Sequence, residues 1–231
     1  MYKYYYMGAM RNHNDFINKI NKEFSSYMLM DILKHIAKQI NAEILSIAHQ
    51  DYEPQGASVT MMIADDVEKS ELRNCNDSIV GHLDKSHITS HTYPENHPNS
   101  KIASIRFDIE VSTCGNITPL KALNYILKVF DPNLIIADYR IRGFTRDIKG
   151  DMHFMDHSMD SITDHILINY KDKYETIDIN NENERNYHTK MYNKEIDIDH
   201  CIIGQLPKES NVDKVSKKLL NDMMKVVAGN G

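Results

Sequence analysis

The chain has 231 residues, and its 33 Asp and Glu outnumber its 27 Lys and Arg, for a formal net charge of −6. Hydrophobic residues make up 41% of it, enough for a substantial core and too many for a wholly disordered protein. The negative charge disfavours general nucleic-acid binding and suits a cationic substrate. No apolar run is long enough to span a membrane, and the N-terminus lacks a secretory pattern, so we expect a cytoplasmic protein.

The first elements are an amphipathic helix and a pair of strands. Apolar residues recur at helical spacing over 27–41 and predict a helix there. Its buried face is formed by Leu29, Ile32, Leu33, Ile36 and Ile40. Strands are expected at 44–48 and at 59–63, where apolar and polar residues alternate. A turn that contains proline and glycine separates them at 51–56.

The middle of the chain contains the clearest strand. Residues 65–78 are polar and are expected to form a surface excursion. The β-branched, histidine-rich segment 79–92 indicates a strand with an interruption at 84–86. Residues 105–111 alternate between apolar and polar more regularly than any other segment, and the strand they predict ends at 112–115.

The remaining elements are two helices with a strand between them. Thr118 and Pro119 are residue types typical of a helix N-cap and first turn. The buried stripe of the helix that they begin is Leu120, Leu123, Leu127 and Phe130. A strand is expected at 134–141, weaker elements at 158–193, and a last helix near 212–227.

The order of these elements indicates the fold class. Strands outnumber the helices between them, which argues against regular βαβ winding. We therefore predict an α+β fold, a two-layer sandwich in which a mainly antiparallel sheet carries its helices on one face. With no internal repeat and no low-complexity linker, residues 1–231 are expected to form a single domain.

The densest group of reactive side chains lies between Gly81 and His97. Its histidines are His82, His87, His91 and His97. One interpretation is a strand with solvated or hydrogen-bonded histidines. A second is zinc binding, but no Cys-x-x-Cys pair accompanies them. A third is hydrolysis with Ser86 as nucleophile and His91 as base, but the Gly-x-Ser-x-Gly elbow is absent.

The cysteines do not form a disulfide framework. The chain has three, at Cys75, Cys114 and Cys201, and an odd, sparse set indicates free thiols. Cys114 ends the clearest strand beside Gly115, and its ordinary interpretation is a buried structural thiol. Cys75 and Cys201 are assigned no role.

Several stretches of the chain resemble the S-adenosylmethionine decarboxylase family, in its proteobacterial, pyruvoyl-dependent form. The similarity begins at about Leu29. Its longest stretches are 50–60, 82–98, 108–115, 119–125, 139–147 and 188–191. Several long identities in the same order are far more specific than a single motif. The chain departs from the family in a short N-terminus, a short excursion at 65–78, and Thr89–Ser90 in place of a more apolar pair.

The resemblance implies a self-processing enzyme. Ser86 attacks the carbonyl of Lys85, and cleavage between them gives a β chain, 1–85, and an α chain, 86–231, that begins with a pyruvoyl group. This group forms a Schiff base with S-adenosylmethionine and supports its decarboxylation. The product is decarboxylated S-adenosylmethionine, the aminopropyl donor for spermidine biosynthesis.

The resemblance also assigns roles in proton transfer. His91 is the proton acceptor in processing, Ser58 assists processing, and Cys114 is the proton donor in turnover. In a regular strand, Ser86 and His91 face opposite sides because five residues separate them. We therefore expect a bulge or kink between them.

Two residues match substrate contacts of the family. Glu95 stands where a carboxylate pairs with the ribose hydroxyls, and Tyr52 where an aromatic ring stacks on adenine. A carboxylate accepts hydrogen bonds from two hydroxyls, and an aromatic face attracts a sulfonium cation. On the residues alone, Glu95 is a surface acid, Tyr52 a turn tyrosine and Ser58 a strand serine.

The resemblance further implies Mg²⁺ as an activator and a homo-oligomer of αβ protomers, a dimer or a tetramer. No nucleic-acid or membrane partner is expected. The run 151–157 contains two Asp and two His, but magnesium prefers oxygen ligands and retains waters, so the location of a metal site stays unknown.

Two alternative functions stay open. The same pyruvoyl chemistry acting on ornithine or arginine is one, but those substrates have no nucleoside for Tyr52 and Glu95 to hold. The other is a non-catalytic regulatory homologue, which has no need of an intact Ser86, His91 and Cys114.

Overall fold

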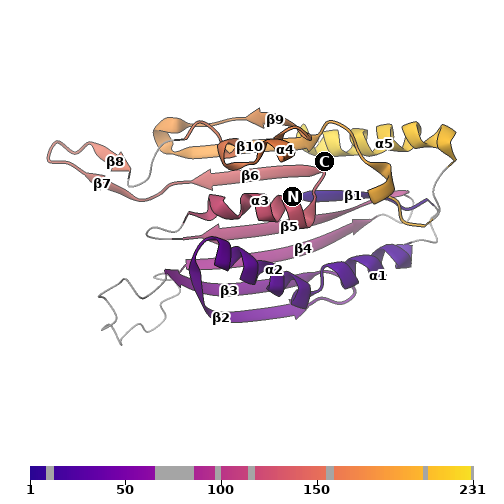
Figure 1. The fold of residues 1–231 in the computed structure, drawn as a ribbon, viewed down its shortest axis with the longest axis horizontal. Helices are drawn as coiled ribbons and strands as arrows, with labels where there is room; N and C mark the ends of the chain where they lie inside the picture. The colour runs from indigo at the N-terminus through magenta and orange to yellow at the C-terminus, as the bar shows by residue number, and fades with distance from the viewer. Residues whose placement is uncertain are drawn as a thin grey trace.

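The computed structural model describes residues 1–8, 13–65, 86–96, 100–113, 118–154, 159–204 and 208–229. Its main feature is an eight-stranded sheet whose strand pairs are antiparallel (Figure 1). The strand order is β2-β3-β4-β5-β1-β6-β10-β9. A smaller sheet, made by β7 and β8, projects beyond one end of the large sheet.

The predicted α+β class and antiparallel sheet are confirmed. The strands of the large sheet are β1 (Tyr2–Tyr6), β2 (Ala42–Asp51), β3 (Ala57–Asp65), β4 (Ser86–Asn96), β5 (Ile102–Ser112), β6 (Leu134–Arg140), β9 (Tyr174–Asp178) and β10 (Asn186–Asn193). The projecting strands are β7 (Phe144–Arg146) and β8 (Met152–Phe154). The helices are α1 (His13–Glu23), α2 (Ser26–Gln39), α3 (Leu123–Phe130), α4 (Ile168–Lys171) and α5 (Glu209–Val227). Shorter 3₁₀ helices lie at Pro119–Ala122, Ile162–His165, Glu182–Glu184 and Ile198–His200.

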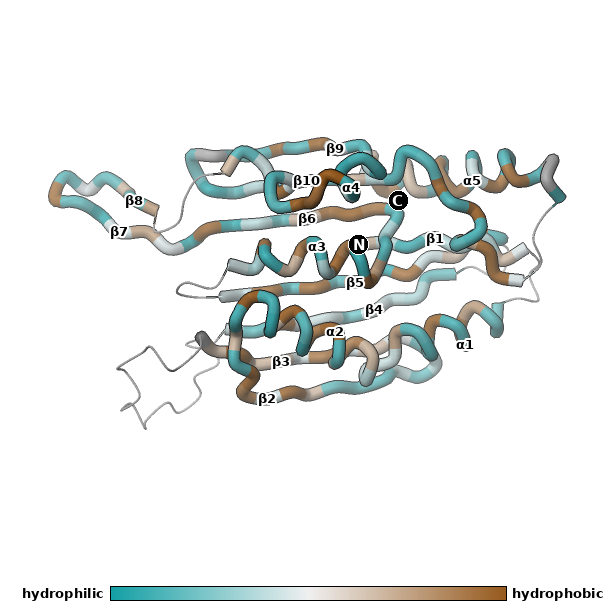
Figure 2. Tube along the Cα trace, viewed as in Figure 1, coloured by the Kyte–Doolittle hydropathy of each residue, from teal (hydrophilic) through white to brown (hydrophobic). Residues whose placement is uncertain are grey.

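One face of the sheet, here called the helix-covered face, packs against α1, α2 and α3. Val59, Met61 and Ile63 of β3 are fully buried on it, and they belong to the same core as Leu33 and Ile36 of α2. Fully burying such a side chain contributes about 1.5–3 kcal/mol. In Figure 2, hydrophobic residues recur along α2, β3 and β6, as this packing requires.

The opposite face, here called the second face, is covered in part by α5. Tyr4 and Leu134 form a separate core with Leu219 and Met223 of this helix. This departs from the predicted arrangement with helices on one face. Because alternate residues of a strand point to opposite sides, Tyr4 lies on the other side of the sheet from Tyr5, and its large ring needs a cover.

The predicted elements are found close to their expected limits, and the structure adds others that were not predicted. The helix expected at 27–41 is α2, and the clearest predicted strand is β5. Thr118 precedes the next helix, but its side chain makes no capping hydrogen bond, and the first turn is 3₁₀. Strands β1, β7 and β8 and helix α1 were not predicted. The expected excursion at 65–78 lies, apart from its first residue, outside the described residues.

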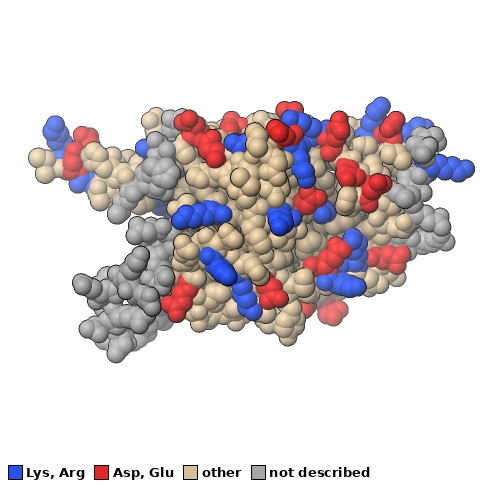
Figure 3. Space-filling view, viewed as in Figure 1, with Lys and Arg blue, Asp and Glu red and all other residues tan. Residues whose placement is uncertain are grey.

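The surface and the helices agree with the composition. Basic and acidic side chains are interspersed on the face drawn in Figure 3, so it carries no broad patch of one charge. No helix in the described part of the chain is long and apolar enough to cross a membrane.

Candidate active site

Strand β4 lies between β3 and β5 and begins at Ser86. Ser86 is 4% exposed and pairs in register with Ile63, and its neighbour His87 pairs with Ser112 at the end of β5. Alternate residues of β4 from Ser86 to Pro94 are buried on the helix-covered face. The predicted nucleophile is therefore the first residue of a buried central strand.

Ser58 and His91 lie directly opposite one another on β3 and β4. Directly opposed residues of antiparallel strands have Cα atoms about 4.5–5.5 Å apart and side chains on the same face. Asp108 of β5 is opposite His91 on its other side, and the Tyr93 ring stacks at 6.2 Å from the imidazole. The structure thus brings together the two residues expected to assist processing.

The prediction of a bulge between Ser86 and His91 is wrong. The pairing of β3 with β4 runs without a register shift from Ser86 to His91, so the two side chains face opposite sides of the sheet. Five residues of strand also place them about 17 Å apart along β4. His91 of one chain is therefore far from Ser86 of the same chain.

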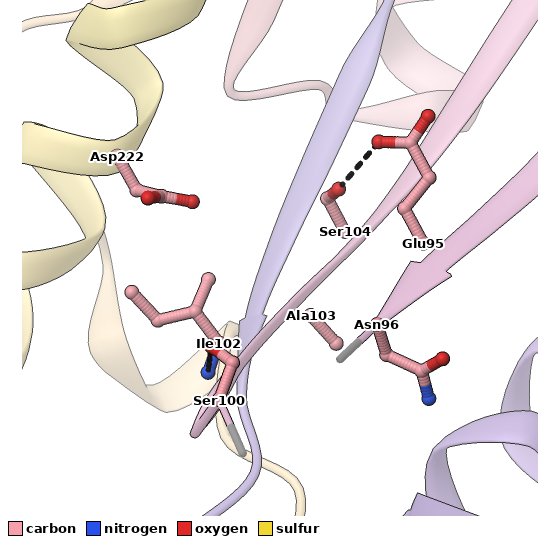
Figure 4. Close-up of a pocket in the computed structure, with 7 residues that line it drawn as sticks. All are labelled: Glu95, Asn96, Ser100, Ile102, Ala103, Ser104 and Asp222. Carbon is pink, nitrogen blue, oxygen red and sulfur yellow. Dashed lines mark hydrogen bonds between the residues drawn. The ribbon is translucent and has the colours of Figure 1, made fainter. Parts of the chain in front are cut away.

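Glu95 lies near the opposite end of β4 from Ser86. Its carboxylate accepts a hydrogen bond from Ser104 Oγ at 3.3 Å and lies 3.8 Å from the Arg106 guanidinium. It borders a cavity of about 310 Å³ between the sheet and α5, where Asp222 faces the same space (Figure 4). The other lining residues are Asn96, Ser100, Ile102, Ala103 and Ser104. Several polar side chains that accept hydrogen bonds therefore line the cavity beside Glu95, the residue predicted to bind the ribose hydroxyls.

The turn that carries Tyr52 packs on the same end of β4. Tyr52 donates its backbone N–H to the Gly56 carbonyl at 2.9 Å, and Gln55 Nε2 donates to the Pro94 carbonyl at 3.0 Å. Gly56 has a φ of 95°, and a Cβ there would lie 2.8 Å from the Thr92 carbonyl oxygen. Only glycine therefore lets the turn approach β4 at Thr92, three residues before Glu95.

Sequence reasoning missed Arg106, which connects several of these residues. Its guanidinium lies 4.3 Å from the centre of the Tyr93 ring and 3.3 Å from Asp108, as well as near Glu95. The signal was present, since the regular alternation of β5 places Arg106 and Asp108 on the polar side. With Asp108 and Glu95 around one arginine, and Glu110 further along β5 beside His87, this part of the second face is acidic, which suits a cation.

The remaining predicted residues include two that lie outside the described residues, Lys85 and Cys114. Ser112, two residues before Cys114, is opposite His87, so the strand leading to Cys114 ends beside Ser86. Cys201 is 3% exposed in the core under α5, and burial raises the pKa of its thiol to about 11. Cys201 is therefore part of the core that α5 covers.

The described residues offer no magnesium site. No group of three or more His, Cys, Asp or Glu among them is arranged to hold a metal ion. In the run 151–157, His153 contacts Asp147 at 3.3 Å within the β7–β8 hairpin, and Asp156 and His157 lie outside the described residues. The expected Mg²⁺ is therefore assigned no ligands.

Comparison with known proteins identifies the family. The pattern of the S-adenosylmethionine decarboxylase family matches residues 24–143. An S-adenosylmethionine decarboxylase proenzyme from Desulfitobacterium hafniense (strain Y51) is 41% identical over 246 residues, which cover 99% of this chain and 89% of the relative. The chain belongs to the S-adenosylmethionine decarboxylase family. The resemblance read from the sequence is thereby confirmed.

Other members of this family match over similar lengths. Proenzymes of the same name from Halorhodospira halophila and Xanthomonas oryzae pv. oryzae are 42% and 43% identical, and cover 93% and 90% of this chain and 83% and 80% of their own lengths. The crystal structure of the adenosylmethionine decarboxylase from Aquifex aeolicus vf5 aligns with 57% of this chain and covers 78% of its own, with a TM-score of 0.26 and 16% identity, too low to support an argument.

Proposed function

We propose that this chain is a precursor that cuts itself between Lys85 and Ser86 and then decarboxylates S-adenosylmethionine. The position of Ser86 carries the proposal, because it begins a buried central strand in a chain whose relatives are named as proenzymes of this decarboxylase. We expect the β chain 1–85 and the α chain 86–231 to stay together as one domain. The product supplies aminopropyl groups for spermidine.

Processing requires a hydroxyl, a proton acceptor and a scissile carbonyl. Ser86 Oγ adds to the Lys85 carbonyl carbon, and transfer of the acyl group from nitrogen to oxygen gives an ester. Loss of the Cα proton of residue 86 then expels Lys85 as a carboxylate, and water replaces the nitrogen, which leaves as ammonia. We assign the proton transfers to His91, with Ser58 opposite it to hydrogen-bond the tetrahedral oxygen.

The resulting pyruvoyl group supplies a ketone that condenses with the substrate amine and accepts the electron pair released with carbon dioxide. The surroundings of Ser86 fit such a group, because this position is 4% exposed and shielded from bulk water by the core. We propose that Cys114 donates the proton that replaces the carboxylate. The end of β5 at Ser112, opposite His87, supports this, since Cys114 follows two residues later.

One chain does not bring all these residues to one substrate. Ser86 and Glu95 are nine residues apart on a regular strand, or about 30 Å. The amine of S-adenosylmethionine and its ribose hydroxyls are separated by about eight covalent bonds, or at most about 12 Å. A substrate held by Glu95 therefore does not reach residue 86 of the same chain.

We infer that the active site is shared between two copies of the chain. Ser86 and Cys114 come from one copy, and Ser58, His91, Glu95 and Tyr52 come from the other. A two-fold axis makes two such sites at once, because each copy then gives both groups. The smallest assembly that fits is a dimer, and a tetramer is a pair of such dimers.

The choice of substrate depends on Glu95 and Tyr52, which the second copy contributes to the site. The acidic surface around Glu95 suits a sulfonium cation, and we assign the aromatic face for it to Tyr52, in the turn that packs on the same end of β4. Ornithine and arginine are also cationic, but they have no ribose for Glu95 to bind. S-adenosylmethionine is therefore the substrate that uses both residues.

Intact mass and substrate competition test the reaction. The native protein is expected as two fragments, 1–85 and 86–231, the larger with a carbonyl that reacts with hydrazines, and Ser86→Ala is expected to stay whole. S-adenosylmethionine, ornithine and arginine are then offered and the released carbon dioxide is measured. An uncut wild-type chain would support the non-catalytic alternative, and faster release from ornithine or arginine would overturn the substrate.

Cleavage in mixed assemblies tests the shared site. Ser86→Ala and a tagged His91→Ala chain each stay uncut when made alone. When they are co-expressed, Ser86 of the tagged chain meets the intact His91 of its partner, so roughly half of the tagged chains are expected to be cut. No cleavage of tagged chains in a mixture that contains mixed dimers would contradict the shared site.

A further inference from the structure

Strands β7 and β8 form a hairpin, here called the arm (residues 144–154), that extends beyond the large sheet (Figures 1 and 3). The two strands pair with each other and, among the described residues, with no strand of the large sheet. All residues from Arg142 to His153 are exposed. An isolated two-stranded hairpin is marginally stable in water, so an arm of this kind ordinarily rests on something.

The arm is nevertheless held in one shape by local contacts. Asp147 accepts hydrogen bonds from the backbone N–H groups of Lys149 at 2.8 Å and Asp151 at 3.0 Å, which closes the turn. At its base, Phe144 and Phe154 meet edge to face at 6.1 Å. A preformed shape lowers the ordering cost of binding, which is a property of a docking element.

The arm presents apolar side chains to solvent. Ile148, at the tip, is 104% exposed, the largest value among the exposed hydrophobic residues of the described chain, and the tip is partly hydrophobic in Figure 2. Met152 is 50% exposed and Phe144 43% exposed. Single exposed apolar residues are ordinary, but three on one small projection indicate a contact surface.

The arm begins at the Ser86 end of the sheet. It follows β6, which ends at Arg140, and Arg142 Nη2 lies 3.5 Å from Ser112 Oγ. Ser112 is opposite His87. Whatever covers residue 86 from outside the chain is therefore adjacent to the base of the arm.

We propose that the arm docks on a second copy of this chain, with Ile148 against the second face near Ser58, His91 and Glu95. The proposal rests on the shared active site, which requires that part of a second copy to meet the Ser86 end. The arm extends about 13 Å from Phe144 to Ile148, so it reaches past residue 86 onto the second copy. The described helix α5 lies over β1, β6 and β10 and leaves the β3–β4 part of that face uncovered.

Association of the full chain tests the arm independently of the chemistry. The Ser86→Ala background is used, because its chains stay uncut. Ile148→Glu is expected to weaken self-association at least roughly tenfold in sedimentation equilibrium, because it removes the apolar tip and sets a negative charge against the acidic surface around Glu95. Ile148→Leu should associate as the parent does. Since Ile148 is fully exposed within one copy, the Glu variant has no reason to unfold, and circular dichroism checks this.

Two further measurements complete the test. Ile168→Glu is the matched control, because Ile168 of α4 is 71% exposed away from the arm, and its association should not change. A photoreactive benzoyl-phenylalanine at position 148 should cross-link to residues 57–65 or 86–96 of another copy. The docking proposal is overturned if Ile148→Glu associates like the parent, or if position 148 cross-links only to other residues. This holds even if the mixed assemblies show a shared site. The expected cross-link supports docking of the arm even if the chain is not cut between Lys85 and Ser86.

Discussion

The Thr92 hydroxyl and the backbone of Ala57 join β4 to the start of β3. Thr92 Oγ1 accepts a hydrogen bond from the Ala57 N–H at 2.8 Å and lies 3.4 Å from the Ala57 carbonyl oxygen, and both residues are 1% exposed. The contact lies between Ser58–His91 and the turn of Tyr52. It therefore fixes two parts of the proposed substrate-binding group relative to each other.

Thr92→Val is expected to lower the free energy of unfolding by about 1–3 kcal/mol, because it leaves the buried Ala57 N–H without a partner. Processing should slow, because Ser58 and Tyr52 lose a positional restraint. Thr92→Ser keeps the hydroxyl and should process at nearly the parent rate. Urea denaturation and the rate of chain cleavage check the pair, and equal behaviour of the Val and Ser variants would contradict this role.

Ser90 lies in the core with its hydroxyl unpaired. It is 0% exposed, its Oγ has no hydrogen-bond partner among the described residues, and its neighbours across β3 and β5 are Val59 and Ile109. Ser90→Ala removes the unpaired group and should raise the free energy of unfolding by about 1 kcal/mol. Thermal unfolding of the uncut Ser86→Ala background measures it.

Thr89→Ala, one residue away on the opposite side of β4, is the control for Ser90 and should change the unfolding free energy by about 0.5 kcal/mol or less. A loss of stability on Ser90→Ala would mean that the hydroxyl is satisfied in solution.

Glu95→Gln is expected to reduce kcat/KM for S-adenosylmethionine. Removing a charged acceptor from paired hydroxyls costs about 1.5–3 kcal/mol, or roughly 10- to 150-fold. Complete processing must be verified first, because an uncut precursor imitates failed binding. Glu175→Gln, an exposed acid on the edge strand β9, should leave kcat/KM unchanged. Full activity of Glu95→Gln would place ribose recognition elsewhere.

Cys201 is expected to resist alkylation in the folded protein. Burial raises its thiol pKa from 9.0 to about 11, which lowers the thiolate fraction at pH 8 about 100-fold. Iodoacetamide labelling at pH 8, followed by mass spectrometry of the Cys201 peptide, should show slow reaction in buffer and rapid reaction in guanidinium. Equal rates in the two solvents would show that the core under α5 is open.

The fold was predictable where periodicity is strong. The alternation over 105–111 and the apolar stripe of 27–41 correspond to β5 and α2, because both patterns reflect burial on one side. Strand β1 has little alternation, since Tyr2, Tyr4 and Tyr5 provide apolar surface on both faces. Its place between β5 and β6 is set by pairings with residues a hundred positions away, which no local pattern reports.

The arrangement of the candidate site residues could not be predicted from the sequence. The opposition of Ser58 and His91 depends on strand register, and β4 stays regular where a bulge was expected. A bulge was needed only if Ser86 and His91 act within one chain. The contacts of Arg106 required the neighbouring strand to be known, because its partners Tyr93 and Glu95 lie on β4.

The sheet order determines how a chain cut before Ser86 would come apart and reassemble. The piece 1–85 contains β1, which lies between β5 and β6, as well as β2 and β3 at one edge, so the two pieces are interleaved in one sheet. Neither piece can leave without breaking pairings in two places. Once heat has separated them, they must meet again as two molecules, so recovery depends on concentration. The uncut Ser86→Ala chain, by contrast, keeps its pieces covalently joined and can refold at any dilution.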